Sequence, residues 1–396
     1  MNEKIKLGII GVGNMGSGHA GNIRDGKCPD FEITALADNN PERLEWVKEQ
    51  KYGENITYFD NAIEMLDSGL IEACIIAVPH YEHCLFAIEC MKRGIHVMVE
   101  KPAGVYTKQV REMNAVADEH PEVVFGMMFN QRTNCVYRKV KELVDSGKYG
   151  RIRRTNWIIT DWYRPQAYYN SGGWRATWAG EGGGVLLNQC PHQLDLWQWI
   201  CGMPKKVQSH IHYGKWHDIE VEDDVTTYVE YENGATGVFI TTTGDAKGTN
   251  RFEIQMDKAK IVVENTIYKD SLIVEEFAIS EPEFSKTNTV PFGNLESKII
   301  DVELDGQSPQ HIGVLNAWGD AILRGGKLVA NGKEGINGLT ISNAMHLSSF
   351  LGKEIELPFD EDLYYEELMK RVATSKVKEG VRTVFADTSK TYSGNK

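Results

Sequence analysis

A cluster of glycines near the beginning of the chain constrains the fold more than any other feature. Residues 4–10 form a largely apolar run typical of a buried strand, and residues 11–16 (Gly-Val-Gly-Asn-Met-Gly) follow at once, ahead of a helical pattern. In this context the three glycines allow a tight turn, close approach of the backbone to a pyrophosphate, and close packing of helix on strand. The N-terminus of the helix then faces the phosphates. The motif predicts a dinucleotide-binding turn formed by Gly11, Gly13, Asn14, Met15 and Gly16.

A carboxylate ends the next predicted strand, which covers residues 32–38. Asp38 stands where an acid accepts hydrogen bonds from the adenosine ribose hydroxyls and repels a 2′-phosphate. The two residues after Asp38 carry no positive charge, although Arg43 is near in sequence. The sequence therefore predicts that the cofactor is NAD and that NADP binds less well.

Strand and helix patterns alternate through the first third of the chain. Residues 73–78, 96–100 and 123–129 predict three further strands, and residues 81–93 predict a helix. Strands that alternate with helices form right-handed β-α-β units and a parallel sheet. We therefore expect the α/β fold class, with an N-terminal Rossmann domain over residues 1–130.

The pattern changes after residue 130. Residues 134–146 predict a helix, residues 151–160 predict a strand, and residues 205–305 are rich in strand patterns, with Asn233-Gly234 as a hairpin turn. The two-residue alternation there indicates a sheet with one buried face. We expect a C-terminal α+β domain over residues 131–396, with a large open sheet of mixed or antiparallel strands, used for substrate binding and for oligomerisation.

Composition excludes several classes of function. A net charge of −13 over 396 residues argues against binding to nucleic acid or to an anionic membrane surface. The sequence has no apolar stretch near the roughly 18 residues of a membrane span and no signal-peptide pattern. Its seven cysteines include no C-x-x-C pair, so a cytoplasmic location with free thiols is expected. His210, His212 and His217 lack a nearby carboxylate cluster in the sequence, so no metal site is expected.

A lysine follows the fourth predicted strand, in the sequence Glu100-Lys101-Pro102. Ligands of open parallel sheets bind at the carboxyl ends of the strands. A lysine at this place can donate a hydrogen bond or a proton to a reacting hydroxyl. The alternative is an ordinary solvated lysine.

A second group of candidates lies in the stretch from Gly182 to Asp195. Asn188 and His192 are four residues apart, which predicts one face of a helix that begins near Asn188, with Pro191 in its first turn. Asn188 is then a candidate N-cap, and Asp195 could orient the ring of His192. The alternative is a packed or capping histidine without chemistry.

Together these motifs resemble the glucose–fructose oxidoreductase/inositol dehydrogenase (Gfo/Idh/MocA) family, over roughly residues 4–350. The resemblance rests on residues 11–16, His19, Asp38, residues 77–79 with His83, residues 100–102, residues 174–175 and residues 182–195. It implies a Rossmann domain followed by an α/β domain whose open sheet builds oligomers. It also implies that Lys101 and His192 are catalytic and that the Lys101–Pro102 bond is cis. The residues that it places around the cofactor are Pro79, His83, Glu100, Lys101, Asn130, Trp174 and Arg175.

One residue departs from the family pattern. The family commonly has aspartate four residues before the catalytic histidine, and Asn188 stands there in this chain. An asparagine can hydrogen-bond a substrate hydroxyl, so Asn188 is included with the catalytic residues, but it carries no charge and does not raise the pKa of His192. A neutral His192 is better poised to accept a proton near pH 7. The Asn-Gln-Cys-Pro-His sequence resembles a subgroup of glycoside 3-dehydrogenases.

The substrate expected from these features is a sugar or glycoside. Seven aromatic residues between Trp157 and Trp178 are divided between sugar stacking and ordinary packing. The expected substrate contacts are Lys101, Tyr168, Asn188, His192 and His311. The predicted reaction is NAD-dependent oxidation of a ring secondary hydroxyl, at C3, by a homo-oligomer. The alternatives are an inositol or free-sugar dehydrogenase, a redox-neutral NAD-dependent glycosidase, and a non-enzymatic ligand sensor.

Overall fold

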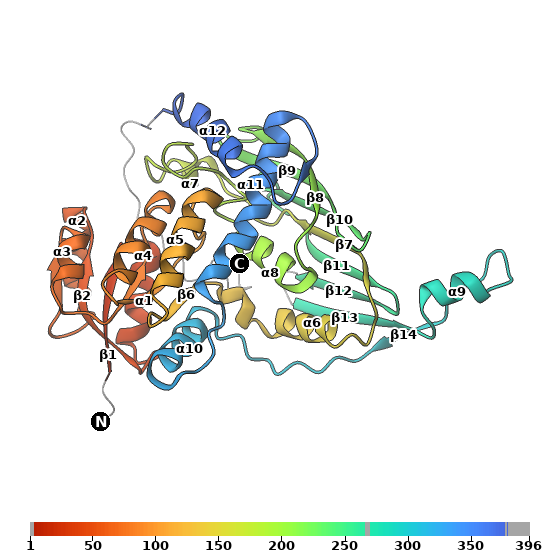
Figure 1. The fold of residues 1–396 in the computed structure, drawn as a ribbon, viewed down its shortest axis with the longest axis horizontal. Coiled ribbons are helices and arrows are strands. Elements are labelled where there is room, and N and C mark those ends of the chain that lie inside the picture. The colour runs from red at the N-terminus through yellow and green to blue at the C-terminus, as the bar shows by residue number, and fades with distance from the viewer. Residues whose placement is uncertain (1–3, 266–269, 377, 379–396) are drawn as a thin grey trace.

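The first sheet contains the amino-terminal part of the chain (Figure 1). The computed structural model describes residues 4–265, 270–376 and 378. Six parallel strands lie in the order β3 (Thr57–Phe59), β2 (Phe31–Ala37), β1 (Ile5–Ile10), β4 (Ala73–Ile76), β5 (His96–Val99) and β6 (Phe125–Met127). The order reverses between β1 and β4, where open parallel sheets bind ligands. This confirms the predicted Rossmann fold. Strand β3, with three residues, was not predicted.

Helices connect these strands and cover the sheet. Their bounds are α1 (Asn14–Arg24), α2 (Pro41–Glu49), α3 (Ala62–Asp67), α4 (His83–Met91) and α5 (Thr107–Glu119), with a short 3-10 turn η1 (His80–Glu82) before α4. The adjacent residues Ile9 and Ile10 of β1 are both buried, and so are Ile75 and Ile76 of β4. Apolar residues at adjacent positions of a strand point to both faces, so the sheet needs cover on both sides. Helix α2 begins as expected at Pro41, and Asn40 caps it by accepting from Glu42 N at 3.0 Å.

The second sheet is larger and mixed. Its nine strands lie in the order β14 (Ser297–Ile300), β13 (Asp270–Phe277), β12 (Ala259–Asn265), β11 (Asn250–Met256), β7 (Ile152–Ile159), β10 (Thr236–Thr242), β9 (Glu222–Glu230), β8 (Lys206–Tyr213) and β15 (Ile355–Glu356). Strands β7 and β10 pair in parallel, and the other neighbours pair antiparallel. The predicted open mixed sheet and the hairpin turn at Asn233-Gly234 are therefore confirmed.

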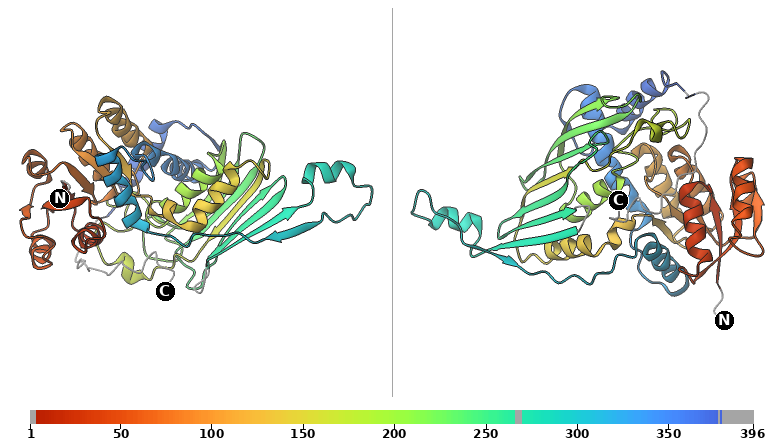
Figure 2. Two further views of the ribbon diagram at one scale, coloured as in Figure 1. Left: turned by 90° about the horizontal axis from the view of Figure 1, so that it is seen from below. Right: turned by 180° about the vertical axis from the view of Figure 1, so that it is seen from behind.

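Three helices pack on one face of this sheet, as Figures 1 and 2 show: α6 (Cys135–Asp145), α8 (Pro191–Cys201) and α11 (Gly335–Leu351). The core between them is aromatic, because Trp157 stacks on Phe252 with ring centroids 4.3 Å apart and Trp197 stacks on Phe239 at 5.4 Å. No described helix lies on the opposite face in either view of Figure 2. This face carries partly exposed residues of alternating strand positions.

The remaining helices lie around this core. They are α7 (Gln166–Tyr169), α9 (Glu281–Thr287), α10 (Gln310–Arg324) and α12 (Glu361–Val372), with the 3-10 turns η2 (Asn130–Thr133) and η3 (Gly332–Glu334). Helix α9 projects beyond the edge of the second sheet (Figure 2). Helix α10 packs on the first sheet, where Trp318 stacks on Phe31 at 5.2 Å and donates to Val124 O at 3.1 Å. A domain boundary at residue 130 stays a prediction, because α10 comes long after residue 130 in the chain and yet packs on the first sheet.

Among the described residues, no helix has both the length and the apolar character needed to cross a membrane.

Candidate active site

The glycine turn has the shape that a dinucleotide requires. Gly11 has a φ of +84°, and a Cβ atom there would lie 2.5 Å from the carbonyl oxygen of Ala77, at the end of β4. A Cβ at Gly13 would meet nothing within 4 Å, so the turn has open space beside it. Gly13 is also the N-cap of α1 and leaves its first-turn N–H groups without a side-chain cap. These features fit a bound pyrophosphate.

Asp38 lies beside this turn, directly after β2. Its Oδ2 accepts from Val12 N and its Oδ1 from Asn40 N, both at 2.9 Å. Arg43 of α2 is buried, donates to the carbonyl of Val12, and donates to Ser17 Oγ at 3.0 Å. Arg43, which is near Asp38 in the sequence, therefore uses its guanidinium to hold the backbone of the glycine turn.

A buried ion pair lies at the carboxyl end of β5. Glu100 Oε1 accepts from His19 Nε2 at 2.7 Å, and both side chains are buried. Burial disfavours the charged carboxylate, but the hydrogen bond and charge of His19, with His311 and Lys101, lower the pKa of Glu100 to about 2. His311 of α10 lies with its ring centroid 5.6 Å from that of His19. Burial, with the neighbouring His19, lowers the pKa of His311 to about 4.

Lys101 extends from this strand end toward the turn that precedes α8. Its Nζ donates to the backbone carbonyl of Asn188 at 2.9 Å. The Lys101–Pro102 bond is cis, as the resemblance implied. His83 links the neighbouring turns, because its Nδ1 lies 2.6 Å from Pro102 O and its Nε2 lies 2.8 Å from Val78 O. These contacts place the ammonium between the two sheets.

His192 is the second residue of α8 and is 1% exposed. Burial, with the positive charge of Lys101, lowers its pKa well below the ordinary range, so the imidazole is neutral near pH 7. Glu100 and His311 also interact electrostatically with His192. A neutral imidazole beside an ammonium can accept a proton from a hydroxyl that the lysine also contacts.

Two expectations about α8 were wrong. The helix begins at Pro191 with Cys190 as N-cap, so Asn188 is not its cap and does not share a helical face with His192. Asn188 lies in the preceding turn, in which its N–H donates to Gly184 O at 2.8 Å. Asp195 does not orient His192, because its two oxygens accept from the guanidinium of Arg132 at 2.7 and 2.8 Å. Arg132 offers a planar pair of donors that matches a carboxylate, and both partners are buried.

Asn188 is surrounded by polar side chains that the sequence did not associate with it. Its Nδ2 donates to Glu181 Oε1, and its Oδ1 accepts from Tyr168 OH at 3.5 Å and from Gln189 Nε2 at 3.4 Å. Arg175 Nη1 donates to the same tyrosine hydroxyl at 2.9 Å. Sequence reasoning missed Glu181 and Gln189, although both stand within seven residues of Asn188.

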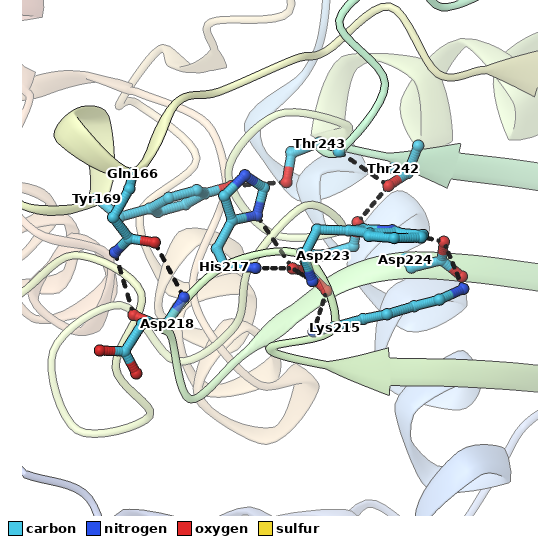
Figure 3. Close-up of polar contacts among 11 residues, drawn as sticks. Gln166, Tyr169, Lys215, His217, Asp218, Asp223, Asp224, Thr242 and Thr243 are labelled. Atoms are coloured by element: carbon cyan, nitrogen blue, oxygen red, sulfur yellow. Dashed lines mark hydrogen bonds and ion pairs between the residues drawn. The ribbon is translucent and has the colours of Figure 1, made fainter.

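Helix α7, which carries Tyr168, is held in place by the hairpin between β8 and β9 and by Thr243, directly after β10 (Figure 3). The side chain of Gln166 accepts from Asp218 N at 2.9 Å and donates to Asp218 O at 3.2 Å. The ring of His217 packs 4.9 Å from that of Tyr169, whose hydroxyl donates to Thr243 Oγ1 at 2.7 Å. We call these contacts the α7 clasp.

A buried aspartate organises the tip of this hairpin. Asp223 accepts from the backbone N–H groups of Lys215, Trp216 and His217 at 2.8 to 3.1 Å, and from the ring of His217 at 3.0 Å (Figure 3). Of the three histidines considered in the sequence, His217 therefore contacts a single carboxylate, Asp223, whose other partners are mainly backbone groups. The described residues contain no group of three potential metal ligands.

The other predicted residues occupy the edges of the same region. Trp174 contacts His80 edge-on at 5.8 Å, and His80 Nδ1 lies 3.1 Å from Glu181 O. Asn130, on η2, is buried and donates to Gln310 Oε1 at 2.8 Å, next to His311. Of the seven aromatics in the stretch 157–178, four are buried: Trp157, Trp162, Tyr169 and Trp178. The others are Tyr168 and Trp174, which are half-buried, and Tyr163, which is exposed.

The fold and this site define an NAD(H)-dependent oxidoreductase. Residues 5–127 match the oxidoreductase family described by its NAD-binding Rossmann fold, and residues 137–262 match the GFO/IDH/MocA C-terminal domain. The chain belongs to the Gfo/Idh/MocA oxidoreductase family.

Relatives of this chain act on cyclic polyols and sugars by name. It is 24% identical to a myo-inositol 2-dehydrogenase of Thermotoga maritima over 69% of this chain and 79% of that protein. It is 29% identical to a D-glucoside 3-dehydrogenase of Escherichia coli over 52% of this chain and 61% of that protein. The WlbA dehydrogenase of Bordetella pertussis, solved with NADH and UDP-GlcNAcA, has 25% identity and a TM-score of 0.75 over 91% of this chain and 99% of its own.

Proposed function

We propose that the chain oxidises a ring secondary hydroxyl of a sugar or glycoside, at C3 of a glucosyl unit, to the ketone. The observation that carries the proposal is the pairing of a buried, neutral His192 with the charge of Lys101 at the carboxyl end of β5. This end of the sheet is where the glycine turn would hold the cofactor. Asn188 adds a neutral hydrogen-bonding group next to Lys101.

Each residue of the site has a distinct role in the proposed reaction. NAD, when bound at the glycine turn, supplies the acceptor of the hydride. His192 takes the hydroxyl proton as general base, an effect of about 10²–10⁴ in rate. Lys101 donates a hydrogen bond to the same oxygen and stabilises the negative charge that develops there. Asn188 and Tyr168 hydrogen-bond neighbouring hydroxyls and orient the ring.

The choice of C3 rests on two kinds of support. The D-glucoside 3-dehydrogenase relative is named for oxidation at this carbon. In addition, a glycoside has no free anomeric hydroxyl, so only a secondary ring carbon or the exocyclic alcohol is open to oxidation. Tyr168 and Trp174 provide half-buried aromatic surface near the site that suits a sugar or an aglycone.

A second candidate function is oxidation of a free cyclic polyol. The myo-inositol dehydrogenase relative favours it, and its chemistry would use His192 and Lys101 in the same roles. The substrates of the two candidates differ in that a glycoside has a ring oxygen and an aglycone, whereas an inositol has neither.

Product analysis separates these functions. The protein is incubated with a panel of glucosides and inositols, with and without added NAD, and the products are identified by mass spectrometry. A keto-glycoside with stoichiometric NADH supports the proposal, and a keto-inositol alone supports the second candidate. Cleavage of the glycosidic bond without net NADH would indicate the redox-neutral glycosidase, and binding without turnover would indicate a sensor.

We also propose that the chain forms a homo-oligomer through the outer face of the second sheet. This face lacks a described helix in Figure 2 and carries the partly exposed Tyr228, Val238, Ile158 and Ile240 on adjacent strands. Light scattering at micromolar concentration is expected to give a mass of at least two chains. A species with the mass of a single chain would refute the proposal.

A further inference from the structure

The carboxylate of Glu181 accepts two hydrogen bonds, one from a backbone N–H and one from the side chain of Asn188. The side chain is 3% exposed, and its Oε2 accepts from the backbone N–H of Ala176 at 2.6 Å. Its Oε1 accepts from Nδ2 of Asn188. A backbone N–H can only donate, and a carboxylate only accepts. When Glu181 is ionised, Asn188 must therefore turn its NH₂ group toward it. Burial raises the pKa of Glu181, whereas the charge of Arg175 and the hydrogen bonds from Ala176 and Asn188 lower it.

The other end of the Asn188 amide is consequently an acceptor. Arg175 donates to the hydroxyl oxygen of Tyr168 at 2.9 Å, so the proton of that hydroxyl is free to point toward Asn188 Oδ1 at 3.5 Å. Gln189 Nε2 is a further donor, 3.4 Å from the same oxygen. All of these hydrogen bonds run in a consistent direction, from Arg175 through Tyr168 and Asn188 to Glu181.

Lys101 ties this chain of hydrogen bonds to the reacting centre. Its Nζ donates to the backbone carbonyl of Asn188 at 2.9 Å, so residue 188 is joined directly to the ammonium that contacts the reacting oxygen in the proposed reaction. The two donors that reach Asn188 Oδ1 are 3.4 and 3.5 Å away, which is long for a hydrogen bond, so this oxygen can still take the proton of a substrate hydroxyl next to the one that is oxidised. A donor at the same place would repel that hydroxyl when it acts as a donor.

We propose that Glu181 is a positioning residue that fixes the Asn188 amide with its oxygen toward the substrate, and thereby selects a substrate hydroxyl that donates at this position. The proposal rests on the function proposed above. Glu181 acts through Asn188 and does not contact the reacting atoms.

The variant Glu181→Gln keeps nearly the same side-chain shape but replaces the acceptor that faces Asn188 by a donor. The N–H of Ala176 still needs an acceptor, so the amide oxygen of the glutamine faces Ala176 and its NH₂ faces Asn188. Asn188 must then flip and present its own NH₂ to the substrate. We expect kcat/KM to fall about 10- to 100-fold, mostly through a higher KM, because a buried donor faces a donor. Affinity for NADH should not change.

A second substitution should reverse this loss. Asn188→Asp alone brings two buried carboxylates together, and we expect lower activity and a lower Tm, with the Tm loss growing as pH rises. In the double variant Glu181→Gln/Asn188→Asp, the glutamine NH₂ donates to one oxygen of the aspartate, and the other oxygen accepts from the substrate as in the native chain. Activity should return to within roughly threefold of the native value, which is a strongly non-additive result. A role of Glu181 in packing alone would give no such rescue.

Glu220 provides a matched control. It also accepts a backbone N–H of this loop, from Trp178 at 3.1 Å, but no contact joins it to Asn188. Glu220→Gln combined with Asn188→Asp is expected to be additive in both activity and Tm.

The cycle of Tm values tests the proposal independently of turnover. Recovery of Tm and of kcat/KM in the Glu181→Gln/Asn188→Asp variant is the expected result, and purely additive losses in Tm would overturn the proposal. If the Tm values recover but the native protein oxidises no sugar or polyol, the proposed function fails and the hydrogen-bond arrangement stands. If His192→Ala abolishes turnover but Glu181→Gln leaves KM unchanged, the proposed function stands and the role of Glu181 is wrong.

Discussion

His192 lies in α8 and Lys101 directly follows β5, and the positive charge of Lys101 acts on the imidazole of His192. Burial keeps the imidazole neutral, whereas Lys101 brings a positive charge beside it. In the proposed reaction, this combination provides a proton acceptor and a hydrogen-bond donor for a single hydroxyl oxygen. The glycine turn that would hold the pyrophosphate is formed by other residues, so chemistry and cofactor affinity are separable.

The variants His192→Ala and Lys101→Ala test this separation. Each should lower kcat at least about 100-fold, because a general base or an oxyanion donor is lost. NADH affinity, measured by fluorescence titration, should survive in both. Retention of more than about a tenth of the native rate by His192→Ala would exclude its role as the base.

Asp38 determines the expected preference for NAD over NADP. Its carboxylate is fixed beside the glycine turn by Val12 N and Asn40 N, and a 2′-phosphate at this place would face a like charge. We expect NADH to bind at least about tenfold more tightly than NADPH, which corresponds to about 1.4 kcal/mol. Titration of both cofactors into stripped protein measures the ratio. Equal or tighter binding of NADPH would show that Arg43 outweighs Asp38.

Local features of these residues were predictable and long-range partners were not. The glycine turn follows from backbone geometry over six residues. The ion pair of His19 with Glu100 and the contact of Lys101 with Asn188 join residues 81 and 87 positions apart, and the sequence offers no signal for either. Asp195 was paired with the wrong side chain for the same reason, because Arg132 is 63 residues away.

Among the elements, helix α8 shows how a single residue sets a boundary. Proline has no N–H to donate and is favoured at the first helical position, so the helix begins at Pro191 itself. The Asn188 turn stays outside the helix, where its side chain can contact both Glu181 and Tyr168.

The α7 clasp should control substrate affinity more than catalysis. His217→Ala removes the ring that packs on Tyr169 and leaves the Asp223 carboxylate short of one donor. We expect a loss of about 1–3 kcal/mol in the free energy of unfolding and a higher KM, with a smaller change in kcat. Urea unfolding and steady-state kinetics measure these effects. His210→Ala, at an exposed position of β8, is the control. An unchanged KM in His217→Ala would show that the α7 clasp does not control substrate affinity.

In the molecule as a whole, the chain crosses between the two sheets three times: after β6, before α10 and before α11. Helix α10 returns from the second sheet and brings His311 to His19. The alternation of strands and helices indicated both sheets, but not the parallel pairing of β7 with β10 or the pairing of β7 with β11. Residue alternation along a strand does not identify its neighbours, so this order depends on tertiary packing.

Acid should destabilise the whole fold through its buried histidines. Burial lowers the folded-state pKa of His80, His83, His192 and His311, the last to about 4, whereas unfolded histidine titrates near about 6.5. The unfolded chain therefore binds more protons below about pH 6.5, and the free energy of unfolding falls there by up to about 1.4 kcal/mol per pH unit for each histidine. Urea unfolding between pH 8 and pH 5 measures this slope. Equal stability at pH 7 and pH 5 would contradict the neutral, buried state of these rings.

The proposed oxidation at C3 is tested by following deuterium from that carbon to the cofactor. A glucoside deuterated at C3 is incubated with the protein and NAD, and the NADH formed is analysed by mass spectrometry. We expect the NADH to carry the deuterium, the product to be the 3-keto-glycoside, and His192→Ala to form neither. Unlabelled NADH from the C3-deuterated glucoside, with deuterium transferred instead from C1 of a free sugar, would contradict it.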